Sequence, residues 1–180
     1  MRLFLLIALS ILLTSTVNDV LVQTSKANVS FRSDAKLELI EAQSSALKGI
    51  INTEKRTFAF SIPIESFEGF NSPLQRQHFN ENYLESSRYK TATFTGKIIE
   101  RLDLTQDGEY IVRTKGKLKI HGVTRERIIK SVLTISDGTF KVKSNFSIFL
   151  DEYNIEIPKI VRQKITEEIQ ININATFEKK

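Results

Sequence analysis

The sequence contains no cysteine and no tryptophan, and only two of its 180 residues are histidine. Without cysteine there is no disulfide, no thiolate metal ligand and no thiol nucleophile. A zinc site takes three or four closely placed ligands, and two histidines without cysteine predict no such centre. The Gly-x-Ser-x-Gly, Walker and dinucleotide-binding glycine motifs are also missing. These absences predict a protein that is not an enzyme and uses no metal and no cofactor.

The two histidines are expected to have structural roles. His78 could pair with Glu81 or Glu85 on one short helix, but a lone histidine there more often packs the helix or caps a turn. His121 comes directly before Gly122, at the end of a predicted strand. We therefore expect the His121 ring to bond the backbone of a turn.

Charge of one sign is not concentrated in any part of the chain. Its 26 Lys and Arg residues outnumber its 21 Asp and Glu residues, which gives a formal charge of +5, and the charges are spread along the sequence. Nucleic-acid-binding proteins usually gather their basic residues on one face or in one run. The sequence therefore predicts no nucleic-acid partner.

The chain also lacks an apolar run long enough to span a bilayer, which takes about 20 residues. Its longest apolar stretch, residues 3–13, follows Arg2 and precedes small polar residues, as is typical of a secretory signal. We predict a signal peptide over residues 1–22, with cleavage between Val17 and Ala27, and a mature domain over residues 27–180. The protein would then be periplasmic or secreted, without a transmembrane segment after cleavage. An uncleaved membrane anchor is the alternative.

What the sequence has in abundance is alternation of apolar and polar residues. In residues 169–177, isoleucine, alanine and phenylalanine alternate with glutamine, asparagine and threonine. Successive side chains of a strand point to opposite faces, so such a strand has one apolar face. Similar patterns predict strands over residues 27–33, 36–42, 46–52, 56–64, 91–104, 109–120, 127–136, 139–151 and 169–177, with Asp-Gly turns at 107–108 and 137–138.

Long strands with one apolar face favour a sheet rolled around an apolar interior. We predict an all-β fold, a single eight-stranded antiparallel barrel with one short helix, residues 74–84, inserted between strands. Residues 70–89 should cover one mouth of the barrel. The side chains expected to point inward are Phe70, Leu74, Phe79, Tyr83 and Leu84, and those expected to stay in water are Arg76, Glu81, Glu85 and Arg88.

Three segments resemble the YceI-like family of secreted bacterial proteins. Residues 78–84 (His-Phe-Asn-Glu-Asn-Tyr-Leu), with residues 89–94 (Tyr-Lys-Thr-Ala-Thr-Phe), are similar to the middle of that family. Residues 116–124 (Gly-Lys-Leu-Lys-Ile-His-Gly-Val-Thr) and residues 151–155 (Asp-Glu-Tyr-Asn-Ile), with Pro158, are similar to two further signatures. The resemblance implies a lipocalin-like barrel that binds long-chain isoprenoids or similar amphiphilic lipids in an elongated apolar pore.

The stripes and the resemblance together predict a non-enzymatic protein that binds and carries a hydrophobic amphiphile, an isoprenoid or similar lipid, in the barrel pore. Small inward residues, Gly96, Thr114, Gly116 and Ser144, could open a channel or match the taper of the barrel. The sequence leaves homodimerisation open. The predicted ligand-binding residues are Phe58, Phe60, Ile62, Phe79, Leu84, Phe94, Ile98, Leu118, Ile120, Phe140, Phe146, Ile148, Ile171 and Ile173.

The alternative hypothesis is a secreted protein-interaction or stress-response module with a packed barrel and no ligand. It would use the lysine-rich strand face of residues 113–119 or the helix and loop around His78. Its lysines also fit a solvated strand face that prevents aggregation at an edge.

Overall fold

The computed structural model describes residues 21–179, so all but the last two positions of the predicted signal peptide lie outside the described residues. Within this range the strands are β1 (Leu21–Asp34), β2 (Leu39–Ser44), β3 (Lys48–Asn52), β4 (Thr57–Pro63), β5 (Thr91–Ile98), β6 (Gly108–Ile120), β7 (Val123–Ser136), β8 (Thr139–Phe149) and β9 (Glu168–Lys179). The helical segments are short: η1 (Ile64–Ser66), α1 (Pro73–His78), the π-helical turn η2 (Phe79–Tyr83), η3 (Asp151–Tyr153) and η4 (Lys159–Val161). No helix in residues 21–179 is long and apolar enough to cross a membrane.

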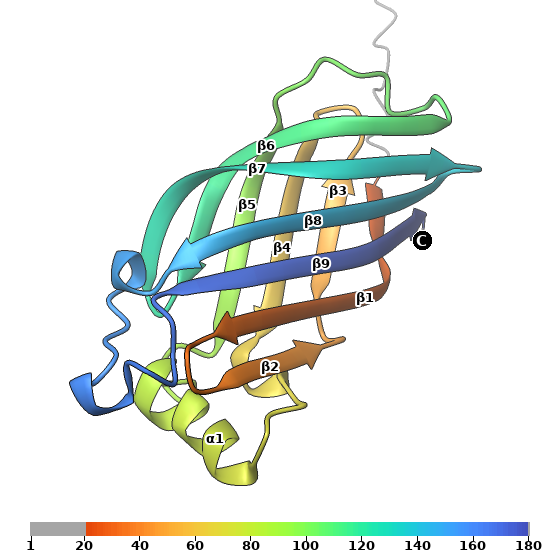
Figure 1. Ribbon diagram of the computed structural model, residues 1–180. Helices are drawn as coiled ribbons and strands as arrows, with labels where there is room; N and C mark the ends of the chain where they lie inside the picture. Colours follow the sequence, from red (N-terminus) through yellow and green to blue (C-terminus); the bar gives the residue numbers. More distant parts are fainter. Residues whose placement is uncertain (1–20, 180) are drawn as a thin grey trace, which may run out of the picture.

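The strands form one antiparallel sheet that closes on itself, because β1 pairs with β9 (Figure 1). β2 and β3 lie one after the other along the same edge of β1, opposite residues 29–34 and 21–23 respectively. They therefore act as a single interrupted strand, and the strands of residues 21–179 build an eight-stranded barrel. The predicted fold class, an all-β antiparallel barrel with one short inserted helix, is confirmed.

The strand bounds differ from the predictions most at the start of β1 and the end of β5. β1 begins at Leu21 rather than Ala27, because a β-bulge between Thr24 and Lys26 interrupts the two-residue alternation of side chains. β5 ends at Ile98 rather than at residue 104. A loop over residues 99–107 takes the place of the rest of the predicted strand and of the expected tight turn. In that loop Asp103 Oδ1 accepts a hydrogen bond from the Thr105 backbone at 2.9 Å, which turns the chain away from the ladder.

Two hairpins have the two-residue turns that match the twist of paired strands. His121 and Gly122, between β6 and β7, have φ angles of 50° and 76°, and Asp137 and Gly138, between β7 and β8, have 49° and 72°. Positive φ at both central positions defines a type I′ turn, in which histidine and aspartate are tolerated better than branched residues. The first of these turns orients the His121 side chain toward Glu85 and Tyr153.

The two ends of the barrel are built differently (Figure 1). At the mouth end, the long segments 64–90 and 150–167 connect β4 to β5 and β8 to β9. At the far end, the connections are residues 53–56, 99–107 and 137–138. On the edge of β2 that does not pair with β1, the strand pairing is reduced to an isolated bridge between Gln43 and Glu68.

Candidate functional site

An apolar cavity of about 560 Å³ runs through the barrel interior, and every strand of the described chain contributes to its wall. This volume falls in the range of about 300–1,000 Å³ that small-molecule sites occupy. All fourteen predicted ligand-binding residues line this cavity. Their contact with a ligand stays a prediction.

Aromatic rings form much of the wall on the β4–β5 side. The ring centroids of Phe58 and Phe60 lie 4.9 Å apart, those of Phe58 and Phe94 also 4.9 Å, and Phe60 reaches Phe177 of β9 at 5.4 Å. Phe58 and Phe60 face the same way because they are two residues apart on one strand. A Cβ at Gly49 would lie 2.2 Å from the Phe60 ring, so glycine there makes room for it.

The small residues of the predicted stripes divide into two groups. Thr114 and Ser144 line the cavity. Their hydroxyls donate to the backbone oxygens of Ile129 and Lys130, both at 3.1 Å, so these donors are satisfied within the wall. Gly96 and Gly116 are directly paired across β5 and β6, and a Cβ on Gly96 would lie 2.5 Å from the Gly116 Cα. These glycines allow two strands to approach closely and do not themselves line the cavity.

Residues 70–89, the lid segment, lie at the mouth end, and their predicted inward side chains Phe70, Leu74, Phe79, Tyr83 and Leu84 all line the cavity. The helix begins where the Ser72 hydroxyl accepts the Gln75 backbone N–H at 3.2 Å, with Pro73 at the first helical position. It ends in the π-helical turn η2, which places Phe79 toward the barrel.

Phe79 packs into a cluster of four phenylalanines that the sequence does not predict. The Phe79 ring is stacked on Phe31 of β1 with centroids 5.3 Å apart, and it lies 5.0 Å from Phe70 and 6.0 Å from Phe67. Phe31 and Phe67 also line the cavity. The predicted strand over residues 27–33 includes Phe31, but nothing local predicts its pairing with the lid segment.

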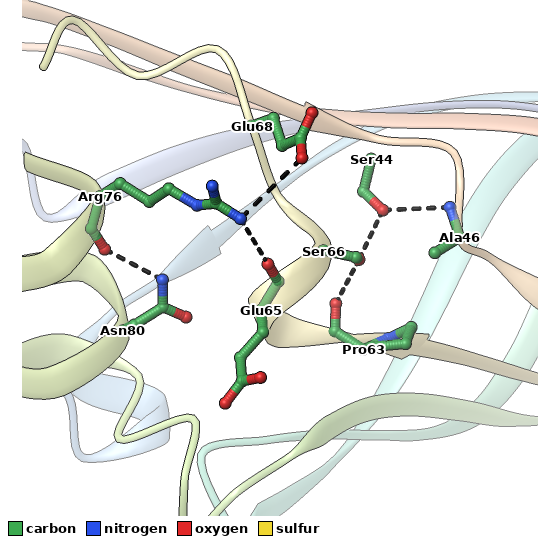
Figure 2. A network of polar contacts seen from close by, with 8 residues as sticks. All are labelled: Ser44, Ala46, Pro63, Glu65, Ser66, Glu68, Arg76 and Asn80. Atoms are coloured by element: carbon green, nitrogen blue, oxygen red, sulfur yellow. Dashed lines mark hydrogen bonds and ion pairs between the residues drawn. The ribbon is translucent and has the colours of Figure 1, made fainter. Parts of the chain in front are cut away.

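The outer side of the lid segment is held by polar contacts, which Figure 2 shows. Arg76 Nη2 donates to the Glu65 carbonyl oxygen at 3.1 Å and lies 3.9 Å from Glu68 Oε1, and Asn80 Nδ2 donates to the Arg76 carbonyl oxygen at 3.0 Å. Nearby, the Ser66 hydroxyl lies 2.6 Å from that of Ser44 on β2. The lid segment is thus fixed by apolar packing on one side and hydrogen bonds on the other.

His121 connects three segments of the mouth end. Its Nε2 lies 2.9 Å from a carboxylate oxygen of Glu85, and its Nδ1 lies 3.1 Å from the Tyr153 carbonyl oxygen of η3. The Tyr89 ring meets the imidazole edge-on at 4.6 Å. The prediction that His121 bonds backbone fits the Tyr153 contact. Glu85, expected to stay in water, keeps 42% of its side chain exposed and also binds His121. Tyr153 itself is fully buried, and this burial raises the pKa of its hydroxyl.

His78 does not pair with either suggested carboxylate. Gln77 Nε2 donates to Glu81 at 3.1 Å, and Glu85 is bound by His121. His78 instead ends α1 and lines the cavity at the mouth. The His78 side chain is exposed, so its expected role in helix packing or turn capping stays a prediction.

Polar side chains line the cavity near its opening. Gln75 of α1 donates to Glu38 at 2.8 Å, which joins the helix to the β1–β2 turn. The Leu37 backbone N–H donates to the Gln163 carbonyl oxygen at 2.8 Å, which joins that turn to the segment 150–167. Lys164 lines the same opening. The wall is therefore apolar along the strands and polar at the mouth, an arrangement that suits an amphiphile better than a pure hydrocarbon.

These features define an antiparallel eight-stranded barrel with a lidded apolar interior. The sequence matches the YceI-like domain family over residues 15–177, and the chain belongs to that family. The resemblance inferred from the three sequence segments is confirmed. No curated protein matches the sequence.

Solved structures share the fold at low sequence identity. A polyisoprenoid-binding domain from Saccharophagus degradans, implicated in plant cell wall breakdown, aligns with a TM-score of 0.76 at 17% identity, over 91% of this chain and 100% of that one. BcnA from Burkholderia cenocepacia aligns with a TM-score of 0.68 at 16% identity, over 83% and 95% of the two chains. The YCEI protein of Campylobacter jejuni gives 0.56 at 17% identity, over 69% and 73%.

Proposed function

We propose that this protein is a non-enzymatic carrier that holds one isoprenoid, or a similar long-chain amphiphilic lipid, in the barrel cavity. The observation behind the proposal is the 560 Å³ cavity, with its apolar wall along the strands and its polar mouth. A solved structure with the same fold is a polyisoprenoid-binding domain, which supports the ligand class. The apolar run near the N-terminus supports a periplasmic or secreted location.

The binding energy would come from burial of the chain. Moving an apolar chain out of water contributes about 0.8 kcal/mol for each buried CH₂ group, so a prenyl tail needs few specific contacts. The phenylalanine and isoleucine wall accepts such a tail, while Glu38, Gln75 and Lys164 at the mouth would contact a polar headgroup. The alternative hypothesis of a packed barrel requires an interior filled by side chains, and the apolar cavity does not support that alternative.

The test is to extract the purified protein with organic solvent and to weigh the intact complex by native mass spectrometry. We expect one lipid per chain, released on extraction. A protein whose native mass equals that of the bare chain, with no lipid in the extract, would contradict the carrier function.

A matched pair of variants ties the cargo to the cavity. Ser144→Phe adds an aromatic ring to the cavity wall of β8, and Lys143→Phe adds the same ring to its exposed outer face. We expect Ser144→Phe to lose the lipid and Lys143→Phe to keep it. Equal lipid content in both variants would place the cargo somewhere other than the barrel.

A further inference from the structure

Exposed apolar side chains gather around the cavity mouth. Ile160 of η4 is 92% exposed, Leu37 of the β1–β2 turn 62% and Leu74 of α1 58%. A single exposed leucine is ordinary, but apolar side chains from several segments around one opening mark an interaction surface. The hydrogen bonds from Gln75 to Glu38 and from Leu37 to Gln163 hold these segments together. We call residues 36–39, 73–78 and 157–165 the rim.

The rim is also basic, although the chain as a whole is only mildly so. Its single carboxylate, Glu38, already accepts a hydrogen bond from Gln75. Its five cations are exposed: Lys36, Arg76, Lys159, Arg162 and Lys164, of which Arg76 lies 3.9 Å from Glu68 outside the rim. At the far end, residues 53–56, 99–107 and 137–138 contain five carboxylates and three cations. The formal charges are therefore +4 (five minus one) on the rim and −2 (three minus five) at the far end.

The rim combines these two properties on one short loop. Ile160 points into solvent, while its neighbours Val161, Lys164 and Ile165 line the cavity. Three backbone hydrogen bonds, Val161 N to Pro158 O at 3.0 Å, Lys164 N to Val161 O at 2.8 Å and Ile165 N to Val161 O at 3.1 Å, shape this loop. An apolar tip flanked by cations is what a surface needs to enter the headgroup region of an anionic bilayer.

We propose that the rim docks on the surface of a membrane that contains anionic phospholipids. Ile160, Leu74 and Leu37 enter the boundary between headgroups and acyl chains, and the four rim cations other than Arg76 contact lipid phosphates. The cavity mouth then opens onto the bilayer, so an apolar chain passes between membrane and barrel without crossing water. Docking on a membrane is a property beyond cargo binding. The experiment below detects contact with a bilayer whether or not a lipid fills the barrel.

Because the chain has no tryptophan, Ile160→Trp creates a single fluorescent reporter at the tip of the rim. We expect its emission to shift to the blue, and brominated acyl chains to quench it, when vesicles of phosphatidylcholine and phosphatidylglycerol are added. Ile111→Trp is the matched control, because Ile111 is 63% exposed on the outer face of β6. The full chain is used, and the signal is local to the reporter, so insertion of another segment does not imitate it.

Charge reversal tests the anionic partner. In the Ile160→Trp protein, Lys159→Glu with Arg162→Glu should weaken binding to the mixed vesicles by about tenfold or more, since each surface cation contributes about 1 kcal/mol. Lys141→Glu with Lys143→Glu makes the same charge change on the outer face of β8 and should leave binding nearly unchanged. No blue shift with Ile160→Trp, an equal shift with Ile111→Trp, or equal binding to phosphatidylcholine alone would overturn the proposal.

Discussion

The mouth end and the far end of the barrel cover the apolar interior in different ways. The far end is closed by short connections, and Leu104 of the 99–107 loop fills it with only 3% of its surface exposed. The mouth end is covered by two long segments that are held to each other by side-chain contacts, such as those of His121 with Glu85 and Tyr153. A closure of many separate weak contacts can open without unfolding the barrel, and a single buried plug cannot.

The difference extends to surface chemistry. The far end is acidic and polar, and its loop is held by Glu100, which accepts hydrogen bonds from the backbone and side chain of Arg113 at 2.7 and 2.8 Å. The mouth end combines cations with exposed apolar side chains on the rim. Under the proposed function, the far end would stabilise the barrel and the mouth end would exchange the ligand.

The largest effect on stability should come from the far end. Leu104→Ala removes a buried side chain, only 3% exposed, and should lower the free energy of unfolding by about 2–5 kcal/mol, measured by urea denaturation. Leu37→Ala, at an exposed position of the rim, should change it by less than about 0.5 kcal/mol. Similar losses for both variants would mean that the two ends are equally structural.

Opening the lid segment should affect retention more than folding. Phe79→Ala with Leu84→Ala removes two half-buried cavity residues and should cost about 1–2 kcal/mol of stability, because their burial is partial. Lipid retention, measured by dilution and native mass spectrometry, should fall much further than this loss of stability implies. If retention and melting temperature fall in proportion, the lid segment is ordinary core.

Breaking the His121 contacts should loosen the mouth end with a smaller loss of stability. His121→Asn preserves a residue that tolerates positive φ while removing the contacts to Glu85 and Tyr153, and we expect a loss of about 1 kcal/mol. Amide hydrogen exchange should rise in residues 79–90 and 150–155 and stay unchanged in the 99–107 loop. Faster exchange at the far end as well would show that the ends are coupled.

The smallest effect concerns Glu100 and pH. Partial burial acts to raise the pKa of Glu100, but the hydrogen bonds from Arg113 outweigh it and hold the pKa below its ordinary value. A carboxylate with a lowered pKa stabilises the fold above its unfolded-state pKa, and this contribution is lost as the pH falls through the folded-state pKa. Wild type should therefore exceed Glu100→Gln in stability by up to about 1 kcal/mol at neutral pH, and this advantage should vanish in acid. A difference that persists in acid would point to packing instead of charge.

Much of the barrel could be predicted from the sequence because the strand period is two residues. Once residues such as Phe58 and Phe60 are assigned to one face, each second side chain along that strand points the same way. That parity is why the twelve predicted residues that lie on strands line the cavity, whereas Phe79 and Leu84 reach it from the lid segment. It failed where the backbone departs from it, at the β-bulge after Thr24 and in the loop that begins after Ile98.

The sequence by itself determined the class of fold, the apolar face of each strand and the presence of a helical insertion, since these follow from local alternation and turn residues. The tertiary structure decided that β2 and β3 continue each other, that Glu85 meets His121, and that Leu37, Leu74 and Ile160 surround one opening. It also decided that the interior is hollow, because the space inside a barrel depends on how many strands close it and on their stagger. Contacts between residues far apart in the chain arise only when the sheet closes, and no local pattern encodes them.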